Sequence, residues 1–348
     1  MFDVKNGKFE PITDWVVFFS YISFFPSVVS GPIDRPKTLV PQLEKERTFD
    51  YAQAADGLRQ ILWGLFKKVV IADNCAMLAD FSFNNHNLHG IILIFGAFFY
   101  AIQLYADFSG YSDMAIGIAK LLGFNITRNF NNPYFAQNIA DHWRRWHMSL
   151  TSWLTDYVFT PVSIELRDYD KWGMIIAIMT TFLVSGFWHG ANWTFVVWGL
   201  LYGCYFIPLI LTGKMNKKKE IAAGKRLPSF TEFKNILATF LLVMFTDVLF
   251  RSESLPLAFR YYRNILNLRP PLFAANAYPK WLYIMTLLLV VLMFCIEWIQ
   301  RDKQHALQIQ NIRSLSLRWG IYLAVSFAAL YCIMTSMQQS SGFIYVKF

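Results

Sequence analysis

His189 is the residue whose surroundings point most directly to chemistry. It lies in SGFWHGANWTFVVW, residues 185–198, between Gly186 and Gly190. Glycine has no side chain, so these neighbours permit a helix break and the close approach of a substrate. Burial favours the neutral form of a histidine, which can then act as a general base near pH 7. The alternative is a histidine that only makes structural hydrogen bonds inside the membrane.

A second histidine, His147, lies in DHWRRWHMSLTSWLTD, residues 141–156. On a single helix the spacing of the aromatic residues, leucines and histidine would place them on one face: Trp143, Trp146, His147, Leu150, Trp153 and Leu154. Arginine beside tryptophan suits a membrane interface, where Arg145 could bind phosphates or an anionic substrate. The alternative is an interfacial helix in which His147 only packs among tryptophans.

Acidic residues follow a hydrophobic run in QLYADFSGYSD, residues 103–113. An ionisable group at membrane depth is costly and is therefore a candidate for function. Asp107 and Asp113 fall on different faces of a helix, so they are not expected to form an acid–base pair by themselves. The alternative is that they cap helices or bond to neighbouring backbone.

No metal site is expected from the sequence. His142 and His147 fall on different faces of a helix, and the chain has no HExxH motif. The cysteines form no CxxC pair and are interpreted as small buried apolar residues: Cys75, Cys204, Cys295 and Cys332.

Membrane helices must position these residues, because 55% of the chain is apolar and only 16% is charged. An ordinary soluble domain carries about 25% charged residues. Uncharged runs at residues 193–211 and 319–337 are long enough to cross a hydrocarbon core of about 30 Å. Further candidate spans are residues 91–105, 173–187, 235–250 and 281–296. The sequence therefore predicts an all-α membrane protein with roughly seven or eight embedded helices.

Two segments are less regular. Residues 15–33 are uncharged but contain Pro26, Gly31 and Pro32, which predicts a span that ends in a re-entrant or interfacial turn. Residues 58–72 include basic side chains and are expected to form an amphipathic helix near the interface or lining the protein interior. The opening residues, MFDVKNGKFE, do not resemble a cleavable signal peptide.

The net charge of +9 arises from basic residues between the spans, so membrane orientation is expected rather than a nucleic-acid partner. Residues 214–226 are rich in lysine and are predicted to be cytoplasmic. The next connection, residues 251–280, is then external although it is also basic, which conflicts with this topology. Because no repeat or domain boundary is visible, residues 1–348 are expected to form one membrane domain.

Several long motifs occur in a recognisable order. They are FFPSVVSGPIDRP (residues 24–36), LYADFSGYSDMAIGIAKLLGF (104–124), NFNNPYFAQNIADHWRRWHMSLTSWLTDYVFTP (129–161) and GFWHGANWTFVVWG (186–199). Together they resemble the bacterial branch of the membrane-bound O-acyltransferase family, in its alginate O-acetyltransferase type, which is related to the D-alanyl-lipoteichoic acid transfer protein. The terminal GFIYVKF is also similar.

The resemblance implies a polytopic helix bundle around a transbilayer tunnel with a polar entrance on each side. It implies that His189 is the catalytic residue and His147 the second polar group of the site. The implied reaction moves an acyl group from a cytoplasmic thioester such as acetyl-CoA to hydroxyls of an exported cell-surface polysaccharide. The expected acyl group is acetyl. It further implies a multi-pass location in the cell (inner, cytoplasmic) membrane, a periplasmic or extracellular acyltransferase partner, and no bound cofactor.

These roles agree with the chemistry of the residues. A neutral His189 could take the proton of an acceptor hydroxyl as it attacks the thioester carbonyl, while His147, Asn192 or backbone N–H groups stabilise the oxyanion. Arginines could attract the phosphates of CoA or of lipids. The other candidate substrate-binding residues are Arg144, Arg145, Trp146, Trp188 and Asp107.

Two features depart from the family pattern. Members usually carry several more helices before the FFP motif, so an N-terminally truncated, inactive chain or a structural component of a polysaccharide export complex is an alternative. Residues 161–173, PVSIELRDYDKWG, stand where a more basic, glycine-containing loop is expected.

A channel or transporter is a further alternative function. It is disfavoured because Asp107, Asp113 and Asp247 have no basic residue nearby in their apolar runs.

Overall fold

The protein is seen in a computed structural model that describes residues 2–217, 220–267 and 278–336. All regular elements within these ranges are helices, which confirms the predicted all-α class. The terminal GFIYVKF motif, the last residue of the predicted span 319–337 and parts of the basic segments 214–226 and 251–280 lie outside the described residues.

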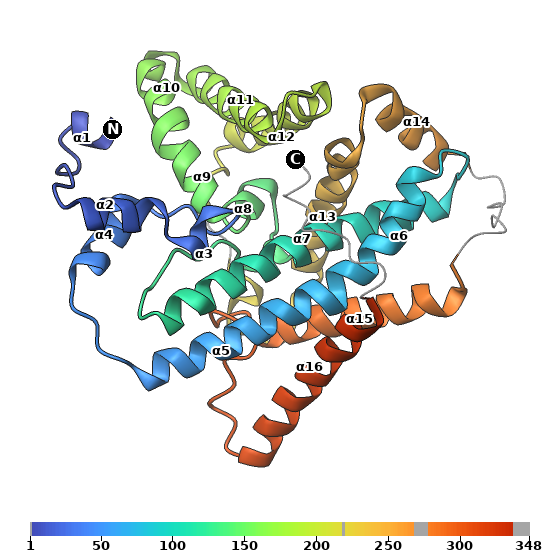
Figure 1. Cartoon of the computed structure of the whole chain (residues 1–348). Helices are drawn as coiled ribbons and strands as arrows, with labels where there is room; N and C mark the ends of the chain where they lie inside the picture. The colour runs from blue at the N-terminus through green and yellow to red at the C-terminus, as the bar shows by residue number, and fades with distance from the viewer. Residues whose placement is uncertain (1, 218–219, 268–277, 337–348) are drawn as a thin grey trace.

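The helices fall into short and long ones (Figure 1). The short α-helices are α1 (Phe2–Lys5), α2 (Trp15–Ile22), α3 (Phe25–Val28), α4 (Pro36–Glu44), α8 (Ile139–Trp143), α9 (Met148–Leu154), α10 (Thr160–Glu165) and α14 (Leu255–Ile265). The long ones are α5 (Tyr51–Phe66), α6 (Asp73–Asn84), α7 (Ile91–Leu121), α11 (Asp170–His189), α12 (Trp193–Leu211), α13 (Phe230–Arg251), α15 (Lys280–Ile299) and α16 (Leu315–Ser336). The remaining helical segments are the π-helices η1 (Lys67–Ala72) and η3 (Thr155–Phe159) and the 3-10 turns η2 (Pro133–Phe135), η4 (Arg167–Tyr169) and η5 (Ala222–Gly224).

Six of the described helices are long and apolar enough to cross a membrane: α7, α11 with the preceding η4, α12, α13, α15 and α16. Each contains one of the runs predicted from the sequence, and α12 has the predicted bounds. Most of α7 is buried inside the protein, whereas α15 and α16 expose most of their apolar surface, as lipid-facing helices do. The chain is therefore a multi-pass membrane protein.

The prediction of a span at residues 15–33 is wrong, and the described residues contain six candidate spans where the sequence predicts seven or eight embedded helices. The segment folds into α2 and α3, and an eight-residue helix such as α2 rises only about 12 Å. A Cβ on Gly31 would lie 2.1 Å from the carbonyl oxygen of Pro26, so the turn requires glycine. Trp15 and Phe19 are exposed on α2, which suits an interfacial position.

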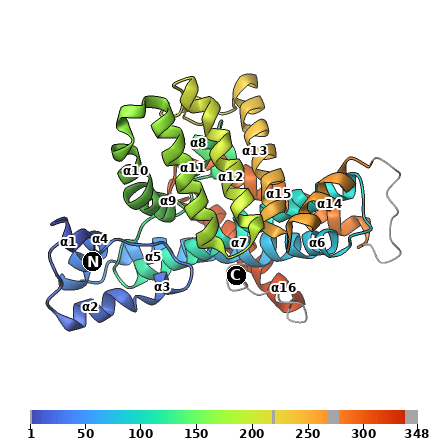
Figure 2. The ribbon, with the colours of Figure 1, turned by 90° about the horizontal axis from the view of Figure 1, so that it is seen from above.

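The long helices are arranged on two sides of a central layer. Seen from above, α11, α12 and α13 stand beside one another on one side of the layer made by α5, α6 and α7, and α16 lies on the other (Figure 2). α11 and α12 form a hairpin, in which a Cβ on Gly186 would lie 2.4 Å from the Phe195 carbonyl oxygen. The helix break predicted beside His189 is confirmed, because α11 ends there and Gly190 adopts extended backbone.

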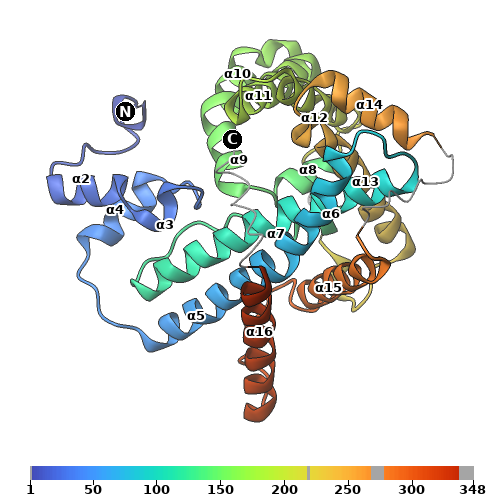
Figure 3. The ribbon, with the colours of Figure 1, turned by 45° about the vertical axis from the view of Figure 1, so that its right-hand side comes forward.

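Within the central layer, α5 and α7 run side by side (Figure 1, Figure 3). A Cβ on Gly64 would lie 2.4 Å from the Gly110 carbonyl oxygen, and one on Gly57 would lie 2.6 Å from that of Gly117. Small residues at such contacts let helix backbones pack closely in membranes. Much of the segment 58–72 is buried by this packing, which confirms the interior-lining alternative for it.

The π-helix η1 places two lysines against α7. Lys67 Nζ lies 2.6 Å from Asp113 Oδ2, and Lys68 Nζ lies 2.9 Å from Asp107 Oδ1. The two carboxylates are ion-paired, so the alternative that they only cap helices or bond neighbouring backbone is wrong. The argument against a channel or transporter is therefore also wrong, because it relied on the absence of basic residues near these carboxylates in the sequence. Their partners, Lys67 and Lys68, come from another helical segment.

Residues 141–156 do not form one helix, which contradicts the prediction. α8 and α9 are separated by a break in which His147 has a φ of 42°. This left-handed conformation is uncommon for a residue other than glycine and cannot continue a right-handed helix. The predicted aromatic face is split as a result, since Trp146 and His147 are buried while Trp153 is exposed.

All four cysteines are free thiols. Cys75 is buried as predicted, but the prediction of burial is wrong for Cys204 and Cys295, which are exposed on α12 and α15. These helices can present their apolar surface to lipid, where a thiol is accommodated as well as in a protein core.

The two ends of the helix bundle carry different loops. At one end, Trp298 Nε1 donates to the Arg226 carbonyl oxygen over 2.8 Å, which ties the end of α15 to the basic segment 214–226. At the other end, the backbone N–H of Gly90 donates to the Asn264 carbonyl oxygen over 2.9 Å, which ties the start of α7 to α14. We call these the basic-loop end and the α14 end.

Candidate active site

The structure brings His147 and His189 together around Trp188. The ring centroid of Trp188 lies 6.2 Å from that of His147 and 4.9 Å from that of His189, both in edge-to-face geometry. His147 belongs to the break between α8 and α9, and His189 is the last residue of α11. The part of the chain described here contains no group of three or more potential metal ligands. Two histidines that the sequence singles out separately thus share one site.

Aromatic rings of neighbouring helices surround His189. Its ring centroid lies 5.3 Å from that of Trp198 in α12 and 5.0 Å from that of Phe250 in α13. Such edge-to-face contacts are favourable because the positive ring edge meets the negative ring face. A Cβ on Gly190 would lie 2.7 Å from the Phe195 ring, so the residue that ends the helix must also be small. The contacts of the His189 ring in these helices are therefore mainly aromatic.

His147 is almost fully buried, with 4% of its surface exposed. Its ring packs edge-on against Phe108 of α7 at a centroid distance of 4.7 Å, and its Nδ1 atom lies 3.1 Å from Asn129 Oδ1. Burial, with a smaller effect of nearby His189, lowers the pKa of His147 to about 3. The ring is therefore neutral at pH 7.

Small cavities lie beside His189 and beside Asn129, the hydrogen-bond partner of His147. One of about 10 Å³ is lined by His189 and by Asp247 of α13. Another, of about 30 Å³, lies toward the basic-loop end and is lined by Asn129 among other polar residues. Its basic lining residues are Lys67, Arg128, Lys303 and His305. About 10–15 Å³ is needed to hold one water molecule, so a continuous tunnel through the protein stays a prediction.

The arginines of the RRWH motif are bound to protein groups. Arg145 Nε donates to Asp141 Oδ1 over 3.0 Å, and Arg144 donates to the carbonyl oxygen of Met215. Trp146, between these arginines and His147, is buried. These contacts hold the break between α8 and α9 in place, and substrate binding by the three residues stays a prediction.

Asn192 fixes the turn that follows His189. Its Oδ1 atom accepts from the Thr194 N–H over 3.1 Å and so caps α12, while its Nδ2 atom donates to the Glu253 carbonyl oxygen over 2.8 Å. Its role in stabilising an oxyanion therefore stays a prediction, as does substrate binding by Asp107, which is held in the ion pair described above.

The sequence points to neither Asn129 nor Glu297 as part of the site. Glu297 is buried in α15, where both carboxylate oxygens lie 3.0 Å from the Tyr105 hydroxyl. An acid at the end of an apolar run is the same signal that picks out Asp107, but the predicted span stops at residue 296. Asn129 gives no such signal, because only the fold brings it to His147.

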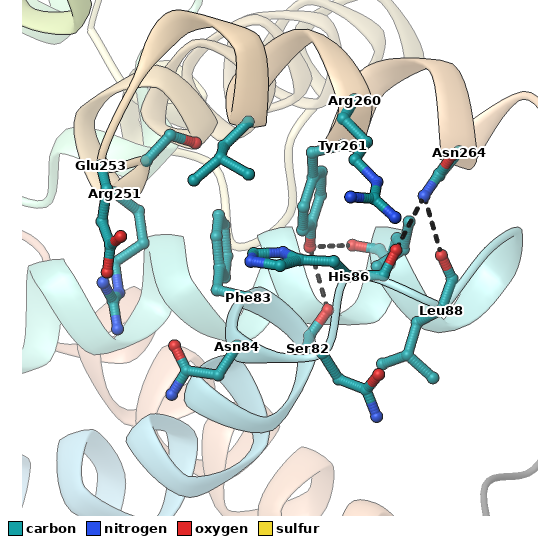
Figure 4. Close-up of a pocket in the computed structure, with 14 residues that line it drawn as sticks. Ser82, Phe83, Asn84, His86, Leu88, Arg251, Glu253, Arg260, Tyr261 and Asn264 are labelled. Atoms are coloured by element: carbon teal, nitrogen blue, oxygen red, sulfur yellow. Dashed lines mark hydrogen bonds between the residues drawn. The ribbon is translucent and has the colours of Figure 1, made fainter.

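A larger cavity, of about 200 Å³, lies at the α14 end, between the α6–α7 connection and α14 (Figure 4). The hydroxyls of Tyr261 and Ser82 lie 3.1 Å apart on its wall, and Arg251 and Arg260 also line it. Arg251 directly follows Phe250, which contacts His189. This cavity therefore lies beside the wall of the histidine site.

The described residues form helices only, with six candidate membrane spans and two neighbouring histidines among apolar side chains, and this defines a polytopic membrane protein with a candidate polar site. The chain is a member of the membrane-bound O-acyltransferase family, whose model matches residues 11–245. His147, Trp188 and His189 all lie within the matched range.

Comparison with individual relatives confirms the branch of the family. The chain is 36% identical over 265 residues to the probable alginate O-acetylase AlgI of Azotobacter vinelandii, a match that covers 76% of this chain and 50% of the relative. It is 36% identical over 267 residues to the peptidoglycan O-acetyltransferase of Helicobacter pylori, covering 75% and 48%. It is 32% identical over 245 residues to the teichoic acid D-alanyltransferase of Bacillus subtilis, covering 67% and 60%. The chain thus spans about half the length of the first two relatives.

Proposed function

We propose that this chain acts as a membrane O-acyltransferase that transfers an acetyl group from a cytoplasmic thioester to hydroxyls of an exported cell-surface polysaccharide. The observation that carries the proposal is the joint position of His147 and His189 beside Trp188 in a chain of this family. Two of the relatives are named for acetyl transfer to alginate and to peptidoglycan, which are both built from sugars.

His189 is assigned as the general base. A neutral imidazole accepts the proton of the acceptor hydroxyl while the hydroxyl oxygen bonds to the carbonyl carbon of the thioester. Collapse of the tetrahedral intermediate then breaks the carbon–sulfur bond, and the proton passes from His189 to the departing thiolate, which leaves as a thiol. The rings of Trp198 and Phe250 pack against the base and would limit the access of water, and with it hydrolysis of the thioester.

The donor is assigned to the basic-loop end. The cavity there is lined by the ion pair Lys67–Asp113 and by Arg128 and Lys303, and the last two suit the phosphate groups of a donor such as CoA. Asn129 lines this cavity and contacts His147, which supports a donor route from this end to the histidines. Loops rich in lysine are usually cytoplasmic, which supports a cytoplasmic donor and the inner membrane as location. Side chains must move apart to admit the acyl chain.

The acceptor is assigned to the α14 end. The turn after His189 is held there by the hydrogen bond from Asn192 to Glu253. The cavity beside it is lined by Arg251, which pairs with Asp80 over 2.8 Å, and by Arg260, whose positive charge suits an acidic polymer (Figure 4). A periplasmic or extracellular acyltransferase partner would complete delivery to the polysaccharide.

Transfer of a labelled acetyl group tests the proposal. Membranes that contain the protein and the neighbouring export proteins receive radiolabelled acetyl-CoA, and label in cell-surface polysaccharide is measured. His189→Ala should abolish transfer, whereas Gly320→Ala, in α16 on the other side of the central layer and with nothing within 4 Å of the new Cβ, should retain it. Equal label with wild type and His189→Ala would overturn the assignment of the base. No label from wild type would contradict the donor and favour a structural component of an export complex.

One observation favours a second candidate function, a channel or transporter. The ion pairs Lys67–Asp113 and Lys68–Asp107 lie within the bundle, as charged groups along permeation paths do. Ion flux into proteoliposomes distinguishes the two functions. Flux that Asp113→Asn abolishes and His189→Ala leaves intact would support transport, whereas absence of flux with His189-dependent acetyl transfer supports the enzyme.

A further inference from the structure

Asn129 holds the ring and the backbone around His147. It is fully buried. Its Oδ1 atom lies 3.1 Å from His147 Nδ1, 2.9 Å from Ser149 Oγ and 3.3 Å from the backbone nitrogen of Ser149. Its Nδ2 atom donates to Ser112 Oγ over 3.2 Å, and its carbonyl oxygen accepts from the Met148 N–H over 2.9 Å. All polar groups of this side chain are therefore engaged.

These hydrogen bonds decide which way the amide points. A backbone N–H can only donate, so the atom that faces the Ser149 nitrogen must be the amide oxygen of Asn129. The opposite orientation would set two donors against each other. The oxygen has no proton to give, so His147 Nδ1 must carry the hydrogen of their bond. The neutral ring of His147 is therefore the Nδ1–H tautomer, and its Nε2 atom is unprotonated.

The same neighbour stabilises an uncommon backbone conformation. His147 has a φ of 42°, which residues with a side chain rarely adopt outside sites where the surrounding structure enforces it. Asn129 accepts from the N–H of Met148 on one side of His147, and Asn131 donates to the Arg145 carbonyl oxygen on the other, both over 2.9 Å. The chain before α8 thus fixes both ends of the break, which places the ring.

We propose that Asn129 is a positioning residue of the acyltransferase site, which holds His147 with Nε2 as a hydrogen-bond acceptor. The effect of this tautomer of His147 on catalysis rests on the proposed function. An unprotonated Nε2 can orient a donor, such as the hydroxyl of the sugar or a ring N–H of His189, but it cannot donate to an oxyanion. In this tautomer His147 leaves the oxyanion to backbone N–H groups or Asn192.

Matched substitutions separate positioning from folding. Asn129→Asp keeps an oxygen that accepts the Nδ1 hydrogen, whereas Asn129→Leu has a similar size and cannot accept it. Ser149→Ala removes another hydrogen bond to Asn129 Oδ1 without touching His147, so it is the control. The thermal unfolding midpoint of each variant in detergent shows whether it is folded.

Nitrogen-15 NMR of histidine-labelled protein in membranes reports which ring nitrogen carries the hydrogen, and His147→Gln assigns the signal. Wild type, Asn129→Asp and Ser149→Ala should carry it on Nδ1 of His147, while Asn129→Leu should gain the Nε2–H form. A hydrogen on Nε2 of His147 in wild type would overturn the proposal. This result does not depend on whether the chain transfers acetyl groups.

Acetyl transfer supplies a second measurement. Asn129→Leu should lower kcat by about 10- to 100-fold, the usual effect of losing a hydrogen bond that orients a functional histidine, at unchanged KM for the thioester. Asn129→Asp should restore most of the kcat lost in Asn129→Leu. Its carboxylate favours protonation of His147, so the fall of activity on the acid side should move to higher pH. His189 is the other titratable group beside His147. Equal losses in both folded variants would show a packing role and overturn the proposal. A wild type without transfer would instead overturn the proposed function.

Discussion

His305 Nε2 lies 3.1 Å from Asp56 Oδ1, and this contact joins α5 to the segment that follows α15. Lys120, at the end of α7, binds the other carboxylate oxygen of Asp56 at 2.7 Å. His305 also lines the cavity proposed for the donor. One carboxylate therefore ties together three parts of the chain at the basic-loop end.

This cluster should make the fold sensitive to acid. Burial alone would raise the pKa of Asp56, but the hydrogen bonds from His305 and Lys120 outweigh it and hold the pKa below its usual value of about 3.9. The stabilising effect of such a carboxylate is complete above the unfolded-state pKa and is lost as the pH falls through the folded-state pKa. We expect the thermal unfolding midpoint to drop below about pH 4. Asp56→Asn should lower the midpoint at pH 7 and flatten this acid dependence, and an unchanged dependence would contradict the assignment.

The buried pair Lys67–Asp113 should show strong coupling. Removing one partner leaves an unpaired buried charge, which typically costs about 3–5 kcal/mol. Lys67→Met and Asp113→Asn should therefore each destabilise the protein by more than half of the loss in the double variant. Unfolding by denaturant in mild detergent measures this double-mutant cycle, and additive losses would contradict it. The exposed pair Arg167–Asp168 is the control, for which no measurable change is expected.

Close packing of α5 against α7 makes Gly64 intolerant of a side chain. In Gly64→Ala the new Cβ would lie 2.4 Å from the Gly110 carbonyl oxygen, so the helices must separate, at a cost of about 1–3 kcal/mol. Gly320→Ala in α16 is the matched control, because a Cβ there meets nothing within 4 Å. It should leave stability unchanged or raise it slightly. Similar unfolding midpoints for the two variants would show that the contact does not limit stability.

The pH profile of acetyl transfer should not depend on His147. Its lowered pKa of about 3 means that it takes up a proton only in strong acid and stays neutral between about pH 5 and 8. His147→Gln should thus reduce the rate without changing the shape of the profile in that range. Initial rates of label transfer at several pH values measure this. Loss of an acid-side decline in His147→Gln would identify His147 as the titrating base instead.

Membrane spans were the part of the fold that the sequence predicts well, because the signal is local and extends over about 20 residues. Residues 193–211 reappear unchanged as α12, and the described residues of the other long runs lie inside helices. Residues 15–33 are the exception, since hydrophobicity alone does not reveal that Gly31 packs against the Pro26 carbonyl in a turn.

For the site, the sequence identifies the individual residues but not how they meet. His147 and His189 stand out because each is an ionisable group among apolar neighbours. The break at His147 cannot be foreseen from its own segment, since it is enforced by hydrogen bonds that His147 and Met148 donate to Asn129. The pairing of Lys67 with Asp113 is equally hidden, because the two residues belong to different helices.

Lys67 and Lys68 are adjacent in the chain, yet both bind carboxylates of α7. Adjacent residues of a regular α-helix point about 100° apart, and the π-helical turn Lys67–Ala72 accommodates an additional residue in that rotation. Deleting one residue from this turn would restore a regular helix and rotate everything from Asp73 onward by about 100°. The face of α6 that packs on α7 would then turn outward. During evolution of this chain, substitutions in the turn should therefore be tolerated more readily than insertions or deletions.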